Sequence, residues 1–238
     1  MSIRLKIFVV FGALLAACGA FAQESSTQGA GVVNAKTRSV QAKAEELYDR
    51  GEYKRAHFIY QKELAPIGDK YAQYMLGWMY AEGQWVDEDL VIASAWYRLA
   101  AERGSPEFVI VRDEVLGQLD DEDLARSDEA YLNLCSQYAD IVLRMRHVRE
   151  YYESVTEGTT GSRITVSSAP VTIVTGAGGP GMSGDAYYAG VLRGMQKHLD
   201  HITRVLEIEP IDAEHLSLSK LSRLEREVMA YVAVVNDR

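Results

Sequence analysis

Apolar residues recur every three or four positions along most of residues 39–152, with polar residues between them. This spacing places the apolar side chains on one face of a helix. The pattern predicts four helices separated by short turns, over 42–50, 53–65, 70–82 and 90–103. A helix pair of this length cannot bury its apolar face alone, so we expect two helix hairpins that stack on each other.

Residues that start and stop helices support these boundaries. Gly51, Gly83 and Gly104 each follow a predicted helix, as glycine does where the backbone must turn left-handed. Asp89 is placed to cap the helix over 90–103, because a short acidic side chain accepts hydrogen bonds from the first free backbone N–H groups. Ser105, followed by proline and glutamate, predicts a further helix start.

The two hairpins are also similar to each other in sequence. Tyr48 and Tyr80 are 32 residues apart, as are Gly51 and Gly83, whereas Ala56 and Ala93, like Tyr60 and Tyr97, are 37 apart. The second hairpin therefore carries five more residues in the turn between its helices. Such self-similarity is typical of a helical repeat.

One stretch resembles a known family in detail. Residues 72–86 read AQYMLGWMYAEGQWV and are followed by Asp89, Ala93, Trp96-Tyr97, Ala100-Ala101 and Gly104. This resembles the Sel-one-like repeat family, a variety of tetratricopeptide-type helical repeat, although Trp85 and Ile92 stand where that family usually has Gly and Lys. The resemblance implies a short α-solenoid used for protein–protein contact. It also implies that the signature residues pack helix against helix: Leu76, Gly77, Tyr80, Ala93, Trp96, Tyr97 and Ala100.

The rest of the chain predicts helices around a glycine-rich insertion. A helix over 107–118 and a long one from 120 to about 152 are expected to cap the repeat stack, so that 39–152 forms one domain. Residues 153–185 are rich in Gly, Ser and Thr, contain two β-like runs (163–167 and 171–174), and are interpreted as a flexible linker or insertion. Helices over 186–207 and 213–235 are expected to form a C-terminal hairpin, so the fold class is all-α.

The last helix carries a narrow apolar seam. Leu221, Leu224, Val228, Tyr231 and Val235 follow a 3, 4, 3, 4 spacing that suits one partner helix. We expect that partner to be the preceding helix, packed antiparallel. Self-association through this seam is the alternative.

The amino terminus resembles a bacterial secretory signal. Arg4 and Lys6 precede an apolar run over 7–18, which is too short to cross a bilayer. Two cleavage sites fit: after residue 22, giving a signal peptide over 1–22, or after residue 17, leaving Cys18 as a lipid-anchored first residue. Residues 23–38 would then be a flexible leader. We therefore expect a periplasmic or otherwise exported protein, with a lipid-anchored form as the alternative and no transmembrane span.

Charge and cysteine content limit the classes of partner and the disulfides that we expect. The 238 residues include 25 Lys and Arg against 34 Asp and Glu, a formal charge of −9, and no run of basic residues. Nucleic acid is therefore not an expected partner. If Cys18 is removed or lipidated, Cys135 has no intrachain disulfide partner, and we interpret it as a small buried residue on a helix.

Three motifs could carry chemistry, and for each a simpler interpretation is preferred. Residues 176–181 fit a glycine-rich dinucleotide loop, but no strand-helix-strand pattern surrounds them and Pro180 removes one donor. Ser217 and Lys220 fit the first element of penicillin-recognising enzymes, whose other elements are missing. His198 and His201, with His215 on the next helix, would allow a metal site, yet a solvent-facing role is simpler. We expect no cofactor and no catalytic residue.

Two tryptophans outside the signature positions are the candidates for binding. Trp78 occupies an unspecified position of its helix, and Trp85 stands in a turn. Tryptophan is enriched where proteins bind partners, although local packing is the commoner role. The sequence thus predicts a non-enzymatic exported scaffold that binds another envelope protein or a peptide. A metal-dependent binder or enzyme centred on the C-terminal hairpin is the alternative.

Overall fold

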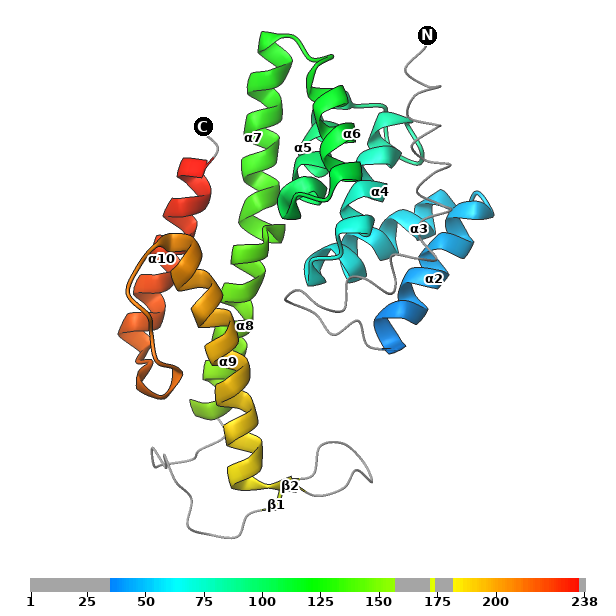
Figure 1. The fold of residues 1–238 in the computed structure, drawn as a ribbon. Helices are drawn as coiled ribbons and strands as arrows, with labels where there is room; N and C mark the ends of the chain where they lie inside the picture. The colour runs from blue at the N-terminus through cyan, green and yellow to red at the C-terminus, as the bar shows by residue number, and fades with distance from the viewer. Residues whose placement is uncertain (1–34, 157–171, 174–181, 236–238) are drawn as a thin grey trace. The chain divides into compact units, whose positions relative to one another are not determined.

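The computed structural model describes residues 35–156, 172–173 and 182–235, and Figure 1 draws their ribbon. The chain divides into two compact units, residues 1–139 and 140–238, each of which is described by itself. The described residues are almost entirely helical, which confirms the all-α prediction. The only strands among them are a pair of two residues each.

Unit one, residues 1–139, is built from successive helices. Its elements are α2 (Ala35–Asp49), α3 (Tyr53–Ile59), the π-helical turn η1 (Tyr60–Leu64), the 3-10 turns η2 (Ala65–Ile67) and η3 (Ala101–Arg103), α4 (Lys70–Ala81), α5 (Leu90–Ala100), α6 (Pro106–Leu116) and α7 (Asp121–Tyr138). The four predicted repeat helices are all present. The first begins at Ala35, so the last residues of the predicted leader are helical.

The two helix pairs, α2/α3 and α4/α5, turn at equivalent glycines. Gly51 after α2 and Gly83 after α4 have φ of 74° and 64°, a left-handed conformation that residues with a Cβ adopt at a cost. Asp89 caps α5 as expected, its Oδ1 accepting from the backbone nitrogens of Val91 at 2.9 Å and Ile92 at 3.0 Å. Ser105 precedes α6, but its side chain makes no capping hydrogen bond.

The core of unit one lies between these helix pairs. Residues at matching positions of the two pairs are buried alike: Ala56 and Ala93 are fully buried, and so are Tyr60 and Tyr97. A Cβ added at Gly77 of α4 would lie 2.9 Å from the ring of Tyr97 on α5, so only glycine allows these helices to approach as closely as they do. The spacing seen in the sequence therefore reflects packing.

Polar contacts join α5 to α7 beside this core. The hydroxyls of Ser94 and Ser127 are 2.6 Å apart and fully buried. Arg98 Nη1 donates to Asp128 Oδ1 at 2.6 Å, and its guanidinium lies 4.1 Å from the centroid of the Tyr131 ring. The helix α7 therefore packs against α5, the second helix of the α4/α5 pair.

The prediction of a single long helix from 120 to about 152 is wrong. Ala139, buried and with extended backbone angles of φ −61° and ψ 143°, separates α7 from α8 (Asp140–Thr156). Asp140 then starts α8, where its carboxylate lies in the positive first turn. The helix α8 belongs to unit two, residues 140–238, whereas α7 belongs to unit one.

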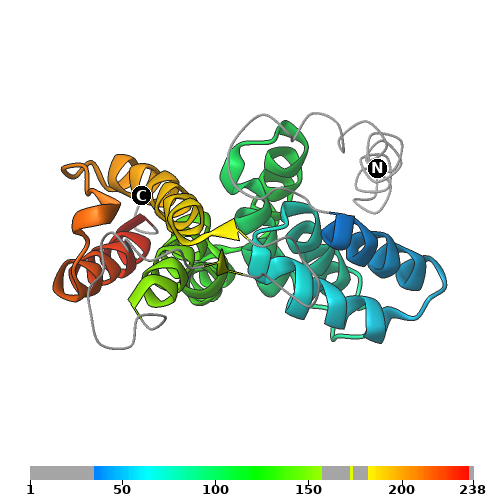
Figure 2. The ribbon, with the colours of Figure 1, turned by 90° about the horizontal axis from the view of Figure 1, so that it is seen from below.

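Unit two contains three main helices. They are α8, α9 (Gly184–Leu206) and α10 (Leu218–Val235), with the 3-10 turn η4 (Ala213–His215) between the last two. The helix α9 packs mainly on α8, and α10 contacts both, as Figure 2 shows. Leu221, Leu224 and Val228 of the predicted seam are buried here, with Val232 rather than Tyr231 continuing it. The predicted hairpin of two helices is therefore part of a three-helix unit.

The predicted insertion is described only at two short strands. β1 (Thr172–Ile173) pairs antiparallel with β2 (Met182–Ser183), with Thr172 opposite Ser183 and Ile173 opposite Met182. β1 falls inside the predicted β-like run 171–174, whereas the run 163–167 lies outside the described residues. Ser183 also caps α9, its Oγ accepting from Ala186 N at 3.3 Å.

Candidate functional site

The turn between α4 and α5 presents an exposed tryptophan in an uncommon backbone conformation. Trp85 is 54% exposed, and its φ of 72° lies in the left-handed region. Such a conformation costs free energy for a bulky residue and is concentrated at functional sites. Neighbouring hydrogen bonds hold the turn, from Gln84 N to Met79 O at 2.8 Å and from Asp89 N to Tyr80 O at 2.9 Å.

Trp85 lies beside the turn of the first helix pair. The Lys54 ammonium is 4.6 Å from the centroid of the Trp85 ring, a cation–π contact between the two pairs. Together they border an open pocket of about 380 Å³. Its lining residues come from the α2/α3 turn and from the α4/α5 turn: Gly51, Glu52, Tyr53, Lys54, Arg55 and Trp85.

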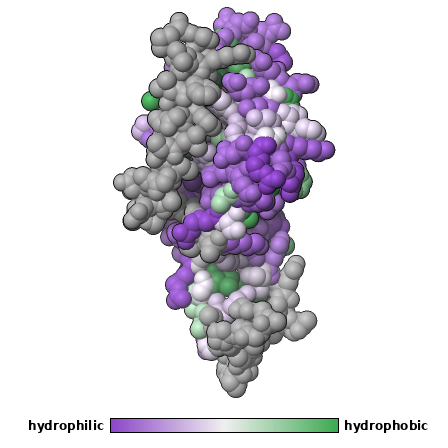
Figure 3. Space-filling view, turned by 90° about the vertical axis from the view of Figure 1, so that its right-hand side faces the viewer, coloured by the Kyte–Doolittle hydropathy of each residue, from purple (hydrophilic) through white to green (hydrophobic). Residues whose placement is uncertain are grey.

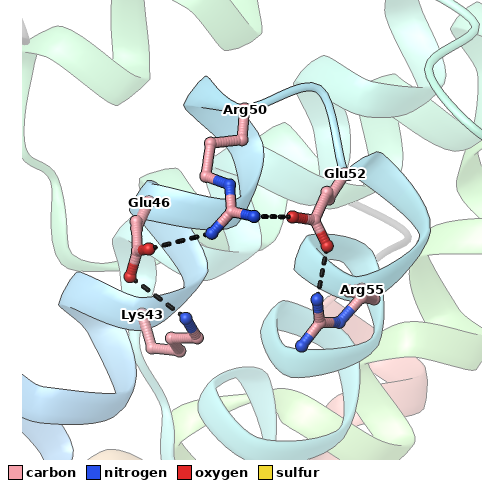
Figure 4. Close-up of polar contacts among 5 residues, drawn as sticks. All are labelled: Lys43, Glu46, Arg50, Glu52 and Arg55. Atoms are coloured by element: carbon pink, nitrogen blue, oxygen red, sulfur yellow. Dashed lines mark hydrogen bonds and ion pairs between the residues drawn. The ribbon is translucent and has the colours of Figure 1, made fainter.

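A chain of ion pairs leads from α2 across the α2/α3 turn to Glu52 and Arg55, two residues that line this pocket (Figure 4). Glu46 lies between Lys43 and Arg50, at 3.1 and 3.2 Å, and Arg50 also reaches Glu52 at 2.7 Å. Arg55 pairs with the other oxygen of Glu52. The hydrogen bond from Lys43, then that from Arg50, keeps the pKa of Glu46 below its usual value. Exposed pairs of this kind add little stability.

The lining of this pocket is locally positive within an acidic protein. It contains two cationic side chains, Lys54 and Arg55, and one carboxylate, Glu52. Glu52 is already bound by two guanidinium groups. A carboxylate entering the pocket would therefore meet more positive than negative charge.

The prediction that Trp78 binds a partner is wrong. Trp78 is a core residue, which agrees with the alternative that it serves local packing. It is 4% exposed and belongs to the main apolar cluster of unit one. Its Nε1 donates to Tyr48 Oη at 2.7 Å, and that hydroxyl donates to Gln84 Oε1 at 2.7 Å. Burial raises the pKa of Tyr48. This relay fixes Gln84 next to Trp85, so Trp78 supports the turn from inside.

The signature positions of the repeat have the packing environment that the resemblance implies. Leu76, Ala93, Tyr97 and Ala100 are fully buried, and Trp96 is 2% exposed. Tyr80 is half-buried, with its ring 6.1 Å from that of His57. Apart from Tyr80, these side chains are enclosed in the core.

The structure does not bring the three candidate metal ligands together. In the part of the chain that is described, no group of three or more His, Cys, Asp or Glu side chains could hold an ion. His215 is exposed and pairs with Asp212, its Nδ1 2.8 Å from Oδ2. His198 instead lies beside His147 of α8, with ring centroids 5.1 Å apart. The packing of α8 on α9 brings His147 and His198 together. Because they lie on different helices, no spacing in the sequence could have predicted this contact.

The serine–lysine motif lacks the geometry of a nucleophile and its base. Lys220 Nζ donates to the backbone oxygen of His215 at 3.2 Å, while Ser217 Oγ contacts Ser219 Oγ at 3.0 Å. Cys135 is a buried free thiol, as expected, and burial raises its pKa to about 11. Such a thiol is a poor nucleophile at neutral pH.

Several predictions concern residues outside the described ranges. These are the signal peptide with Cys18, most of the leader, and the glycine-rich loop over 176–181. Within the described residues, no helix is long and apolar enough to cross a membrane.

Comparison with known proteins gives no further assignment. No protein-family model matches the chain, and neither a curated protein nor a solved structure is significantly similar to it. The case for a function therefore depends on the residues and geometry described above.

Proposed function

We propose that this protein is a non-enzymatic, exported repeat scaffold that binds an extended segment of another envelope protein at the Trp85 pocket. The observation that carries the proposal is Trp85 itself, which is exposed, left-handed and adjacent to an open pocket. A large aromatic side chain in a strained turn is retained more readily where it binds something.

Support for a repeat scaffold comes from the equivalence of the two helix pairs. Both turn at a left-handed glycine, Gly51 or Gly83, and both bury an alanine and a tyrosine at matching positions. The sequence resemblance to Sel-one-like repeats points in the same direction. In such an arrangement, helices supply a rigid frame and turns present the binding groups.

The pocket favours a particular chemistry of partner. The exposed face of the Trp85 ring suits an apolar or aromatic side chain, and Lys54 and Arg55 suit a neighbouring carboxylate. We therefore propose a segment that carries an apolar residue next to Asp, Glu or a free carboxyl terminus. Complementary charge would speed the encounter and fix the register of the segment.

Export to the bacterial envelope is the second part of the proposal. It is supported by the basic, apolar and small-residue order of residues 1–22. The soluble form ends its signal at residue 22, and the lipid-anchored alternative begins at Cys18. The intact mass of the protein purified from cells distinguishes the two forms.

The binding site can be tested by replacing Trp85 with the residue that the repeat family prefers. In Trp85→Gly the ring is removed and the left-handed backbone is relieved, so binding should fall at least about tenfold while stability stays equal or rises. A photo-crosslinking residue at Asp87 in living cells would identify the partner. Calorimetry with the purified partner would then measure the affinity.

Phe58→Ala is the matched control, because Phe58 is equally exposed at 58% and does not line the pocket. It should leave binding unchanged. Equal affinity of the wild type and Trp85→Gly would contradict the proposed site. Loss of binding together with a large fall in melting temperature would instead assign Trp85 a structural role.

A further inference from the structure

Two histidines meet in the contact between α8 and α9 of unit two. The rings of His147 and His198 have centroids 5.1 Å apart, and the Tyr151 ring lies 6.0 Å from that of His198. His147 is half-exposed and its Nδ1 is 3.0 Å from Glu150 Oε2. His198 is more enclosed, and its Nδ1 is buried without a hydrogen-bond partner.

The surroundings of His198 disfavour a second positive charge. Arg144 of α8 is 6% exposed, and Lys197 and His201 flank His198 on α9. Burial, followed by His147 and these neighbours, lowers the pKa of His198 to about 4. A protonated His198 would therefore have a cationic neighbourhood inside the helix contact.

The carboxylates of unit two whose contacts are described below pair with residues other than His198. Glu150 interacts with His147, and Glu225 of α10 accepts from Arg149 Nε at 2.6 Å and from Nη2 at 2.5 Å. On α9, Asp200 accepts from Gln196 at 2.7 Å, and beside η4, Asp212 pairs with His215. None of these contacts places a carboxylate on the His198 ring.

We propose that the contact of His198 with His147 is an acid-sensitive latch that holds α9 on α8 while the His198 ring is neutral and releases α9 when that ring is protonated. At neutral pH the His198 ring packs in this contact as a neutral aromatic group. As the pH falls, an opened unit two can protonate His198 in water, whereas the closed unit can do so only against burial and repulsion. Acid therefore shifts the equilibrium toward the open state.

The sign follows from the lowered pKa. A histidine whose pKa is lower in the closed state contributes stability that is complete above its ordinary pKa of about 6.5 and is lost as the pH falls toward 4. Acid release would thus occur between about pH 6.5 and 4. An exported protein experiences such changes when the external medium is acidified.

The positions of the tryptophans allow the unfolding of the two units to be followed by different signals. Its three tryptophans, Trp78, Trp85 and Trp96, all lie in unit one. Tryptophan fluorescence of the full-length protein therefore reports on unit one, and the remaining far-UV dichroism change reports on unit two. Urea unfolding of the intact protein at pH 7.0 and pH 4.5 can be followed by both signals.

We expect the unfolding constant of unit two to be at least about tenfold larger at pH 4.5 than at pH 7.0. The unfolding constant of unit one, followed by tryptophan fluorescence, should change less. His198→Gln, which keeps size and polarity but cannot be charged, should remove most of this difference. His147→Glu should also remove it, because a carboxylate would attract protonated His198. His215→Gln, at an exposed histidine of the same unit, should retain it.

Two results would overturn the latch. One is the same acid loss in wild type, His198→Gln and His147→Glu. The other is an acid loss that His215→Gln removes as completely as His198→Gln does, which would show that the loss does not depend on the His147–His198 contact. Because His147→Glu alters a half-exposed residue, it keeps the test decisive even if His198→Gln fails to fold.

Discussion

At the scale of single residues, close approach and exposure determine which positions matter. Gly77 is the clearest case of close approach, because a Cβ there would lie 2.9 Å from the Tyr97 ring and 3.1 Å from the Ala93 carbonyl oxygen. Tyr97 is fully buried and cannot swing away. Side-chain volume at this position is therefore limited by backbone and ring atoms together.

Gly77→Ala should destabilise unit one by about 1–3 kcal/mol, since the added methyl group overpacks the α4/α5 contact. The control is Gly190→Ala on α9, where a Cβ would meet nothing within 4 Å. There the higher helix propensity of alanine should stabilise by about 0.5–1 kcal/mol. Chemical denaturation measures both changes, and a neutral Gly77→Ala would show that α4 and α5 can separate freely.

The two tryptophans show how far residue-level prediction reaches. The sequence marks Trp78 and Trp85 equally as aromatic residues outside the signature positions. Only packing distinguishes them, because Trp78 donates to Tyr48 in the core while Trp85 stands in a left-handed turn at the surface. The sequence already placed Trp78 in a helix and Trp85 in a turn where the Sel-one-like pattern usually has glycine, but it did not give the exposure of either residue.

At the scale of elements, local signals place helices well and helix junctions poorly. The glycine and aspartate signals give the ends of α2, α4 and α5 to within a few residues. The break at Ala139 has only a weak signal, since Tyr138, Ala139 and Asp140 contain neither glycine nor proline and Asp140 alone marks the start of α8. There the chain passes from one compact unit to the other.

The capping residues differ in what they contribute. Asp89→Ala should cost about 0.5–2 kcal/mol, because it removes the acceptor for two backbone N–H groups at the start of α5. Ser105→Ala should change stability by less than about 0.5 kcal/mol, because its side chain makes no capping bond. Urea denaturation of both variants tests this contrast, and equal costs would contradict it.

Pro66 also shows the limits of a local signal. The sequence predicts a regular helix over 53–65, directly before this proline. Instead, that helix loosens into the π-helical turn η1, in which Ala65 N bonds to Tyr60 O, before η2. Tyr60 and Leu64 remain almost completely buried through this change. Core packing therefore decides the helix type here.

At the scale of the whole molecule, the division at residues 139 and 140 is the main feature that the sequence did not predict. Unit one is held by the α4/α5 core and by polar contacts from α5 to α7. Unit two has its own core on α8, α9 and α10, and the Arg149–Glu225 pair joins α8 to α10. Each unit thus has interactions that can form and break as a group.

Thermal or urea unfolding at pH 7 should therefore deviate from a single two-state transition. Tryptophan fluorescence should follow unit one, and far-UV dichroism should show both units, giving midpoints that differ. Gly77→Ala should shift the midpoint measured by fluorescence more than the midpoint measured by far-UV dichroism. Coincident curves from the two signals would mean that the units unfold cooperatively.

The face of the molecule drawn in Figure 3 shows no large apolar patch among the described residues. On the face drawn in Figure 3, hydrophobic residues among those described are scattered singly between hydrophilic ones. Single exposed apolar residues are ordinary in folded proteins. Trp85 stands out from them through its backbone conformation and its pocket.

The sequence by itself determined the helical class, the two similar helix pairs and the glycine-marked turns of unit one. These features depend on contacts between residues that are close along the chain, so periodicity and capping signals specify them. Tertiary structure alone decided that α8 belongs to unit two, that Trp78 is buried and Trp85 exposed, and that His147 faces His198. Such features arise when segments far apart in sequence pack together, and no local pattern records which side chains will meet there.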